Sequence, residues 1–331
     1  MPETFSRSEL ETLVAQALAA AGAHAEMARL TAIALVDGEA IGQAGHGLSR
    51  VAQYAAFLRN GRADGAARPE IIAEKPAAVL IDAGHGLAYP ALAMAEAEGE
   101  RRARSQGVAF VGITNSHHSG AMGLPVARLA RRGLVALAFT NSPAAMPVAG
   151  GRRALLGTNP VAAGFPRAAG HAPLVVDLAL STVARGTINR YAQSGTPIPE
   201  GWALDAEGNP TTDAKVALFG SLVALGGTKG AALALVVELL CVALTGAAFG
   251  FEADGFFSEE GNRPRLGQAL LVIDPGALAG QAAYLGRIEA LITTMLEDEG
   301  VRIPGQRHAD TSGTIAVADA LAQTLRHLAR P

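Results

Sequence analysis

The chain of 331 residues is 50% hydrophobic and 17% charged, so its length favours two or three domains and its composition allows a sizeable buried core. A formal net charge of −3 is unlike the strongly basic surface of nucleic-acid-binding proteins. The single cysteine, Cys241, excludes an intramolecular disulfide framework, and we expect it to be a small core residue.

The segment MPETFSRSEL has no basic stretch followed by an apolar core, so we expect no secretory signal. Residues 231–249 are nearly all apolar, but Glu238 interrupts the run and Gly246 ends it. We therefore expect a buried helix of a large core there rather than a membrane span. These features favour a cytoplasmic protein.

The first sixty residues have helical patterns. Ser6 and Glu9 form a capping box that predicts a helix, and Gly22 ends its apolar repeat. Further helices are expected at about 25–40 and over VAQYAAFLRNG, with Gly61 past the end of the latter.

The pattern then changes to short apolar runs bounded by turn residues. Buried strands are expected at 77–82, 108–114, 134–140, 173–179 and 269–274. Helices are expected at 91–104, 122–132, 183–193, 230–245, 280–298 and 314–328. This alternation predicts a layered α/β core and, taken alone, a parallel sheet. Residues 196–213 are rich in Pro, Gly and Asp and predict an ordered loop.

Two adjacent histidines, His117 and His118, follow one of the expected strands in TNSHHSG. On a continuing strand they would point to opposite faces and could not share one metal ion. The other histidines are scattered, without the three or four convergent ligands that zinc requires, so we expect no metal site. One histidine facing a cleft, with the other packed or solvated, fits better.

His46 and Arg50 lie in AGHGLSR, where glycines flank the histidine. An imidazole titrates near neutral pH, and an arginine binds a carboxylate with two parallel hydrogen bonds. Together they suit acid–base chemistry on a small carboxylic acid. The alternative is a loop histidine beside a helix-capping arginine.

Two further segments carry charged groups in unusual places. GGTKGAALALVVELL is not a phosphate-binding P-loop, but its glycines, Lys229 and the following helix start suit an anion; a surface lysine on a tight loop is the alternative. Asp177 falls inside the apolar run VVDLALS. It could orient a histidine or bind a cofactor amide or ribose, or it could pair with Arg185.

In combination these motifs resemble the malate/L-lactate dehydrogenase family of NAD(P)-dependent 2-oxoacid reductases. The resemblance spans roughly residues 6–307 and rests on HGLSR, NSHHSGAMG, TNSP, LGTNPVAAGFP, VVDLALSTVARG, IPEGWALDAEGNPTTD and GGTKGAALALVVELLCVALTGA, in that order. The family includes malate and sulfolactate dehydrogenases and reductases of the cyclic imines Δ1-pyrroline-2-carboxylate and Δ1-piperideine-2-carboxylate.

The resemblance implies an α/β fold without a Rossmann domain. A mixed, mainly antiparallel sheet would bind the cofactor, and a helical domain would come from both chain ends. We expect a helical domain of 1–62 with 308–331, a small α/β segment of 63–118 and a cofactor-binding sheet domain of 119–307. A homodimer is implied as well.

The resemblance also implies residue roles. His46 would donate a proton to the substrate, Arg50 would bind its carboxylate, and His118, with Asp177, would take part in catalysis. Thr158 and Asn159 would line the substrate site. The cofactor NAD(P)H would contact Ser142, Asp177, Leu178, Ala179, Lys229, Gly230, Pro304, Gly305 and Gln306.

Two positions depart from the family pattern. Gly45 replaces a serine before the histidine, and Gln306 replaces a glutamate in PGE. We expect hydride transfer to C2 of a small cyclic 2-imino acid or 2-oxo acid. The alternatives are a malate, lactate or sulfolactate-type dehydrogenase, and a non-catalytic nucleotide- or metabolite-binding homologue.

Overall fold

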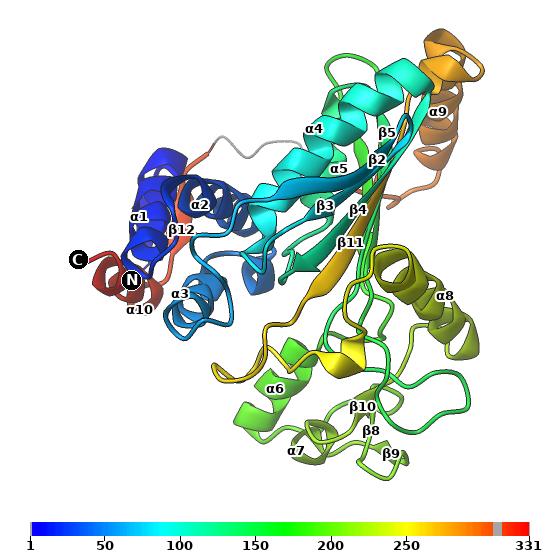
Figure 1. The fold of residues 1–331 in the computed structure, drawn as a ribbon. Coiled ribbons are helices and arrows are strands. Elements are labelled where there is room, and N and C mark those ends of the chain that lie inside the picture. The colour runs from blue at the N-terminus through cyan, green and yellow to red at the C-terminus, as the bar shows by residue number, and fades with distance from the viewer. Residues whose placement is uncertain (1, 307–312, 331) are drawn as a thin grey trace.

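A seven-stranded sheet forms the centre of the computed structural model, which describes residues 2–306 and 313–330 (Figure 1). Its strands, in spatial order, are β2 (Glu70–Lys75), β3 (Ala78–Asp82), β4 (Val108–Ser116), β11 (Leu266–Ile273), β5 (Val135–Thr140), β6 (Val161–Phe165) and β7 (Leu174–Leu178). Only β3 and β4 pair in parallel; the other neighbours are antiparallel. The mixed, mainly antiparallel sheet implied by the resemblance is therefore confirmed.

The parallel sheet expected from the alternation is wrong for two reasons: β2–β3, β5–β6 and β6–β7 pair antiparallel, and β11 separates two strands that run in the same direction. Helix α4 (Ala88–Gln106) connects β3 to β4, and α5 (Gly123–Arg131) connects β4 to β5, as in parallel crossovers. β4 and β5 do run in the same direction, because β11 is antiparallel to both. However, β11 comes from much later in the chain and lies between them, which turns one parallel pairing into two antiparallel ones.

Helices cover both faces of the sheet (Figure 1). α4 and α5 pack on one face, where Val111 and Ile113 of β4 join the larger hydrophobic core. α8 (Thr228–Glu238) and its π-helical continuation Leu239–Ala243 pack on the other face, beside Phe110. The long helix expected at 230–245 thus exists with a change of winding, and Cys241 is a buried free thiol within it.

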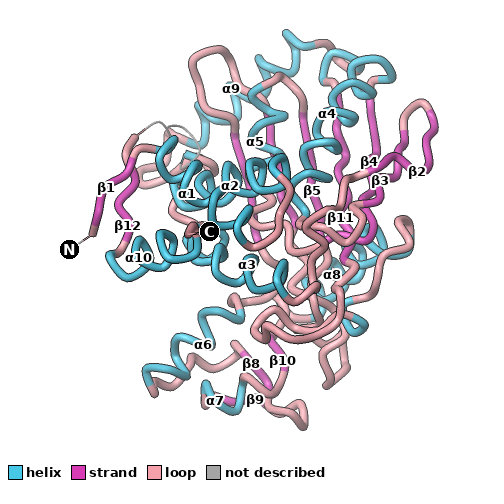
Figure 2. Tube along the Cα trace, turned by 60° about the vertical axis from the view of Figure 1, so that its left-hand side comes forward, coloured by secondary structure: helices cyan, strands magenta, loops and turns pink. Residues whose placement is uncertain are grey.

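A helical unit built from both ends of the chain lies beside the sheet (Figure 2). It contains α1 (Arg7–Ala20), α2 (Ala25–Ala40), α3 (Val51–Arg59) and α10 (Asp319–Leu328). The predicted capping box of Ser6 and Glu9 is present at the start of α1. β1 (Glu3–Phe5) pairs with β12 (Ile315–Val317), so the helix expected at 314–328 begins only at Asp319.

The remaining elements form a small lobe and an outer helix. The lobe contains α6 (Arg185–Ser194), β8 (Ala203–Leu204), β9 (Pro210–Thr211), α7 (Ala214–Ala217) and β10 (Ser221–Leu222). The expected loop 196–213 therefore carries two short strands of a three-stranded sheet. α9 (Gln281–Met295) is the outer helix. Within the described ranges, no helix has the length and apolar character needed to cross a membrane.

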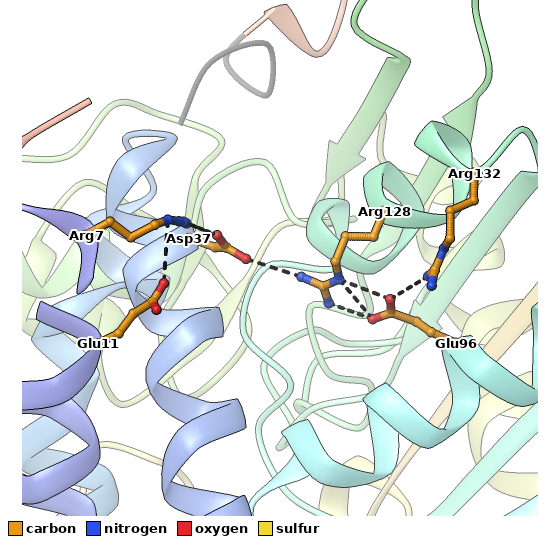
Figure 3. A network of polar contacts seen from close by, with 6 residues as sticks. All are labelled: Arg7, Glu11, Asp37, Glu96, Arg128 and Arg132. Carbon is orange, nitrogen blue, oxygen red and sulfur yellow. Dashed lines mark hydrogen bonds and ion pairs between the residues drawn. The ribbon is translucent and has the colours of Figure 1, made fainter. Parts of the chain in front are cut away.

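A chain of ion pairs joins the helical unit to the helices that cover the sheet (Figure 3). Asp37 of α2 accepts hydrogen bonds from Arg7 of α1 and lies 3.4 Å from the guanidinium of Arg128 in α5. Arg128 also pairs with the buried carboxylate of Glu96 in α4, at 2.6 Å. Because α2 leads directly into the segment that carries His46, this network fixes that segment against the sheet.

Candidate active site

His46 and His118 meet at the junction of the helical unit and the sheet. His46 ends a 3₁₀ turn after α2, and His118 lies just beyond the last residue of β4. Their rings are stacked, with centroids 5.3 Å apart and planes 15° apart. Two histidines that lie far apart in the sequence therefore form one contact pair.

Both histidines of this pair have a depressed pKa. Burial, followed by the charge of Arg50, lowers the pKa of His46 to about 4. Burial also lowers the pKa of His118 well below 6.5, with further contributions from Arg50, His46 and His117. Both imidazoles are therefore neutral near pH 7 in the free protein, and each carries a single N–H.

His117 has a different environment from its neighbour. Its ring is buried against Phe57 and Phe256, with centroid distances of 5.1 and 5.2 Å. Its Nδ1 accepts a hydrogen bond from the backbone N–H of His118 at 2.9 Å. The chain has left β4 here, so loop geometry rather than strand alternation separates the two side chains. In the part of the chain that the structure describes, no group of three or more His, Cys, Asp or Glu side chains is arranged to hold a metal ion.

Arg50 lies close to the stacked pair and is held from two sides. Its Nε donates to the backbone oxygen of Gly45, and its Nη1 donates to Oε1 of Gln53, both at 2.7 Å. Gln53 in turn donates to the carbonyl of Phe256. The phenyl ring of Phe256 packs edge-on against His118, with centroids 5.4 Å apart. Arg50, the two stacked imidazoles and the ring of Phe256 thus lie close together at this junction.

Arg62 anchors the loop that carries Phe256. This arginine is buried and lies over the ring of Phe57, 4.6 Å from its centroid. Its guanidinium donates to a series of backbone carbonyls, those of Asp254, Gly255, Ser258, Glu260 and Asn262. The loop is therefore held largely by a side chain that follows α3.

Asp177 lies at the end of β7, across from the helical unit. One carboxylate oxygen accepts a hydrogen bond from the N–H of Gly123, the first residue of α5, at 2.8 Å. A carboxylate is favourable at this positive end of a helix. Arg185, its suggested ion-pair partner, donates to the carbonyls of Leu218 and Gly220.

A cavity of about 240 Å³ brings several of the predicted cofactor residues together. Its lining is formed by Ile41, Gln43, Val175, Val176, Asp177, Pro304 and Gly305. Gly305 has φ +92°, and a Cβ there would lie 2.6 Å from the backbone nitrogen of Val175, so only glycine fits. The cavity combines a carboxylate with apolar walls, a lining that suits a ribose, and it opens beside the turn that leads to His46.

Ser142 and Thr158 also meet, on two loops beyond β5 and before β6. Ser142 Oγ accepts a hydrogen bond from the N–H of Thr158 at 3.0 Å. Asn159 is fully buried and donates to Glu238 at 2.7 Å and to the carbonyl of Ala234 at 2.9 Å. The Asn159 amide is thus bonded to α8 inside the protein core.

The other predicted cofactor residues differ in their exposure. Lys229 is exposed in the first turn of α8, while Gly230 is buried because its backbone packs closely on the carbonyl of Leu225. Leu178 and Ala179, at the end of β7, are partly accessible, and Gln306 is exposed.

Four residues of the site were missed by the motifs: Gln53, Tyr54, Phe256 and Glu238. Glu238 carried a signal, since it is the one carboxylate of the apolar run 231–249; it accepts hydrogen bonds from Asn141, Asn159 and the N–H of Gly250. Burial raises the pKa of this carboxyl despite those donors. Gln53 and Tyr54 belong to the same helical segment as Arg50, but nothing in their spacing marks them as site residues.

A non-Rossmann sheet that carries one histidine after β4, joined to a helical unit that carries a second histidine and an arginine, defines a distinct class of oxidoreductases. The model of the malate/L-lactate dehydrogenase family matches residues 5–325, and the chain belongs to that family. It is accordingly an oxidoreductase that uses a nicotinamide cofactor.

Individual relatives cover nearly the whole chain. The (2R)-3-sulfolactate dehydrogenase (NADP(+)) of Chromohalobacter salexigens is 50% identical over 93% of this chain and 92% of its own length. The Δ1-pyrroline-2-carboxylate/Δ1-piperideine-2-carboxylate reductase of Pseudomonas putida is 37% identical over 97% of this chain and 95% of its own length. Among solved structures, Δ1-piperideine-2-carboxylate reductase from Pseudomonas syringae gives a TM-score of 0.92 at 36% identity, covering 98% of this chain and 99% of its own.

Proposed function

We propose that this protein transfers a hydride from NAD(P)H to C2 of a small 2-oxo or 2-imino carboxylic acid, with sulfopyruvate, the 2-oxo acid that is reduced to sulfolactate, as the leading substrate. The observation that carries the proposal is Arg50 beside the stacked rings of His46 and His118. A cation next to proton-transferring groups suits a carboxylic acid whose C2 oxygen or nitrogen gains a proton.

In this proposal each residue has a defined task. Arg50 binds the carboxylate with the edge of its guanidinium that faces away from Gly45 and Gln53. The bound cofactor supplies the hydride to C2. His46 donates a proton to the oxygen or nitrogen on C2, and His118 holds that same atom or the nicotinamide amide by a hydrogen bond.

The charge of the substrate prepares His46 for this step. Arg50 contributes to the low pKa of His46 in the free protein. A carboxylate bound to Arg50 offsets that positive charge, so it raises the pKa of His46 and favours proton uptake from solvent. Substrate binding and loading of the proton donor are thereby coupled.

We assign the cofactor to the cavity of Asp177, Pro304 and Gly305, with the exposed Lys229 reaching its phosphates. Ser142, Thr158, Leu178, Ala179 and Gly230 are proposed to complete this contact surface, and Asn159 to support it from the core. NADPH is the proposed preference, because a neutral Gln306 imposes no repulsion on a 2′-phosphate and a 50% identical relative carries NADP(+) in its name.

A cyclic 2-imino acid is the second candidate substrate. It is supported by the apolar ring of Phe256 beside His118 and by the open space around Gly45, where no hydroxyl requires a partner. It is also supported by the relatives whose names carry cyclic imine substrates, at 37–40% identity.

The decisive experiment measures kcat/KM for sulfopyruvate, oxaloacetate, pyruvate and Δ1-piperideine-2-carboxylate, each with NADPH and NADH. The proposal expects sulfopyruvate with NADPH to lead by tenfold or more, which corresponds to about 1.4 kcal/mol of transition-state preference. A lead of that size for the imine would select the second candidate. Absence of nicotinamide oxidation with every acid would contradict the proposal.

We also propose a cytoplasmic homodimer in which α8 contributes to the contact. Its support is a row of exposed apolar side chains along α8 and its continuation: Leu233, Leu235, Val236, Leu239 and Leu244. Of the proposed domains, 63–118 and 119–307 would share the central sheet, and 1–62 with 308–331 would form the helical unit. Light scattering after size exclusion should give twice the 33.7 kDa chain mass.

A further inference from the structure

Two buried tyrosines form a chain of hydroxyl contacts that ends at His118. Tyr54 of α3 is fully buried, and its hydroxyl oxygen lies 2.6 Å from Nδ1 of His118. Tyr89, in the first turn of α4, lies 3.1 Å from the same hydroxyl. Gly120, just after the histidines, makes room for this pair, since a Cβ there would lie 2.6 Å from the Tyr89 hydroxyl. Residues of α3, of α4 and of the segment that follows β4 therefore form one hydrogen-bonded chain.

The direction of this chain follows from the basicity of its members. Each hydroxyl has one proton to donate, and an imidazole nitrogen is a better acceptor than a phenol oxygen. The shorter contact, between Tyr54 and His118, is accordingly O–H···N, and Tyr89 donates to Tyr54. A neutral imidazole that accepts at Nδ1 carries its proton at Nε2.

We propose that Tyr54 is a positioning residue that holds His118 as the Nε2–H tautomer, so that His118 presents a hydrogen-bond donor to the reacting molecules. The inference rests on the proposed function, in which His118 faces the substrate and cofactor. Within the described ranges Nε2 of His118 has no hydrogen-bond partner, whereas Nδ1 is occupied. The free N–H is therefore available for a carbonyl, imine or amide group of a ligand.

The same chain does not relay protons. If His118 gave up its Nε2 proton and took another from Tyr54, the deficit would pass to a buried phenolate. Burial raises the pKa of Tyr54 to about 12 and that of Tyr89 well above 10, so both phenols keep their protons at neutral pH. Tyr54 thus fixes a tautomer and an orientation, and His46 obtains its proton from solvent.

Tyr54→Phe removes only the hydroxyl that sets the tautomer. In protein labelled with ¹⁵N-histidine, the imidazole nitrogen shifts identify the protonated nitrogen, and the His118→Gln variant assigns the signal. We expect Nε2–H in the unmodified protein and a mixture of tautomers in Tyr54→Phe. Turnover should fall about tenfold, the effect of one lost orienting hydrogen bond.

Tyr89→Phe is the matched control, because it removes a buried hydroxyl but leaves the contact between Tyr54 and His118 in place. It should keep the Nε2–H signal and lose no more than about twofold in turnover. The double variant, Tyr54→Phe with Tyr89→Phe, leaves no buried hydroxyl without a partner and should reproduce the tautomer mixture if Tyr54→Phe folds poorly.

A wild-type signal from the Nδ1–H form would overturn the inference, as would an unchanged tautomer after removal of the Tyr54 hydroxyl. The nuclear magnetic resonance result does not depend on turnover. A protein that is inactive with every acid but has the expected tautomer response would therefore contradict the proposed function alone.

Discussion

Arg50 donates a hydrogen bond to Gln53 across 2.7 Å, and through this contact the guanidinium is connected to the loop that carries Phe256. Gln53 thus fixes the direction of the arginine and the position of the apolar ring at the same time. An arginine held from behind by Gly45 and Gln53 loses little side-chain freedom when a carboxylate binds to it.

Gln53→Leu should therefore weaken acid binding more than cofactor binding. Loss of one orienting hydrogen bond, at about 0.5–1.5 kcal/mol, predicts a rise of roughly threefold to tenfold in the KM of the acid. Steady-state kinetics with each reactant varied in turn provide the measurement. Gln193→Leu, on the surface of α6, is the control and should change neither constant.

His46→Ala should lower turnover by about 10²–10⁴-fold, the usual contribution of a positioned proton donor. Cofactor affinity should barely change, because His46 is assigned to the substrate side. Turnover is measured at saturating substrate, with the exposed His171→Ala as the matched control. Activity that survives within a few-fold would assign the proton donation to another group.

Lys229→Ala should raise the KM of the cofactor more than the KM of the acid, because the exposed lysine at the start of α8 is assigned to the dinucleotide phosphates. The difference should shrink as salt increases, since exposed charges are screened. Lys215→Ala, an equally exposed lysine of α7, should leave both constants unchanged. The reverse pattern would place Lys229 on the substrate side.

The protein should lose stability as the pH falls below about 6.5, partly because of His117. Burial, followed by the charge of Arg62, lowers the pKa of His117 to about 3, whereas an unfolded histidine titrates near its usual 6.5. Between these values the unfolded chain binds a proton that the native protein does not. The stabilisation is complete above pH 6.5 and is lost by at most about 1.4 kcal/mol per pH unit as the pH falls.

His117→Asn keeps an acceptor near the His118 amide but cannot titrate. Urea denaturation between pH 4.5 and 7.5 should therefore show a weaker pH dependence for this variant than for the unmodified protein. His171→Asn should retain the original dependence. Identical slopes for all three proteins would exclude His117 as a source of the acid sensitivity.

Gly45→Ser should fold normally and favour polar substrates. A Cβ at position 45 has no atom within 4 Å, so the serine found in the family pattern fits without strain. Its hydroxyl should raise kcat/KM for 2-oxo acids relative to a cyclic imine. Gly47→Ser is the contrasting variant, because its Cβ would lie 2.3 Å from the Glu39 carboxylate, and its melting temperature should fall. An unchanged ratio of substrates would exclude position 45 from specificity.

The sequence predicts the buried strands of this fold well and its pairing poorly. β3, β5 and β7 lie within the expected apolar runs, and β4 and β11 overlap theirs but extend past one end, because a strand covered on both faces is apolar throughout. Two strands of the sheet, β2 and β6, were not expected. All residues of β2 are exposed and EIIAEK lacks a buried face, whereas β6 alternates buried and half-buried residues. The place of β11 depends on contacts between distant segments, which no local pattern records.

The same distinction applies to the site. His46 and Arg50 could be proposed from AGHGLSR, because a glycine-flanked histidine and a nearby arginine are unusual locally, whereas the choice of His118 over His117 came from the family resemblance. Tyr54 and Phe256 could not, since a buried aromatic residue in a helix or loop normally indicates core packing. Their contacts with His118 arise only when α3 and the loop before β11 reach the end of β4.

The antiparallel pairing of β1 with β12 has a consequence for synthesis on the ribosome. α1 and α3 both pack against α10. However, α3 ends at Arg59 and α10 begins only at Asp319, about 260 positions later. At roughly 5–20 residues per second, the nascent helices wait tens of seconds with an uncovered apolar face. Slow completion of the helical unit is therefore expected to limit the yield of folded protein, and chaperones that cover the apolar face during that interval are expected to raise it.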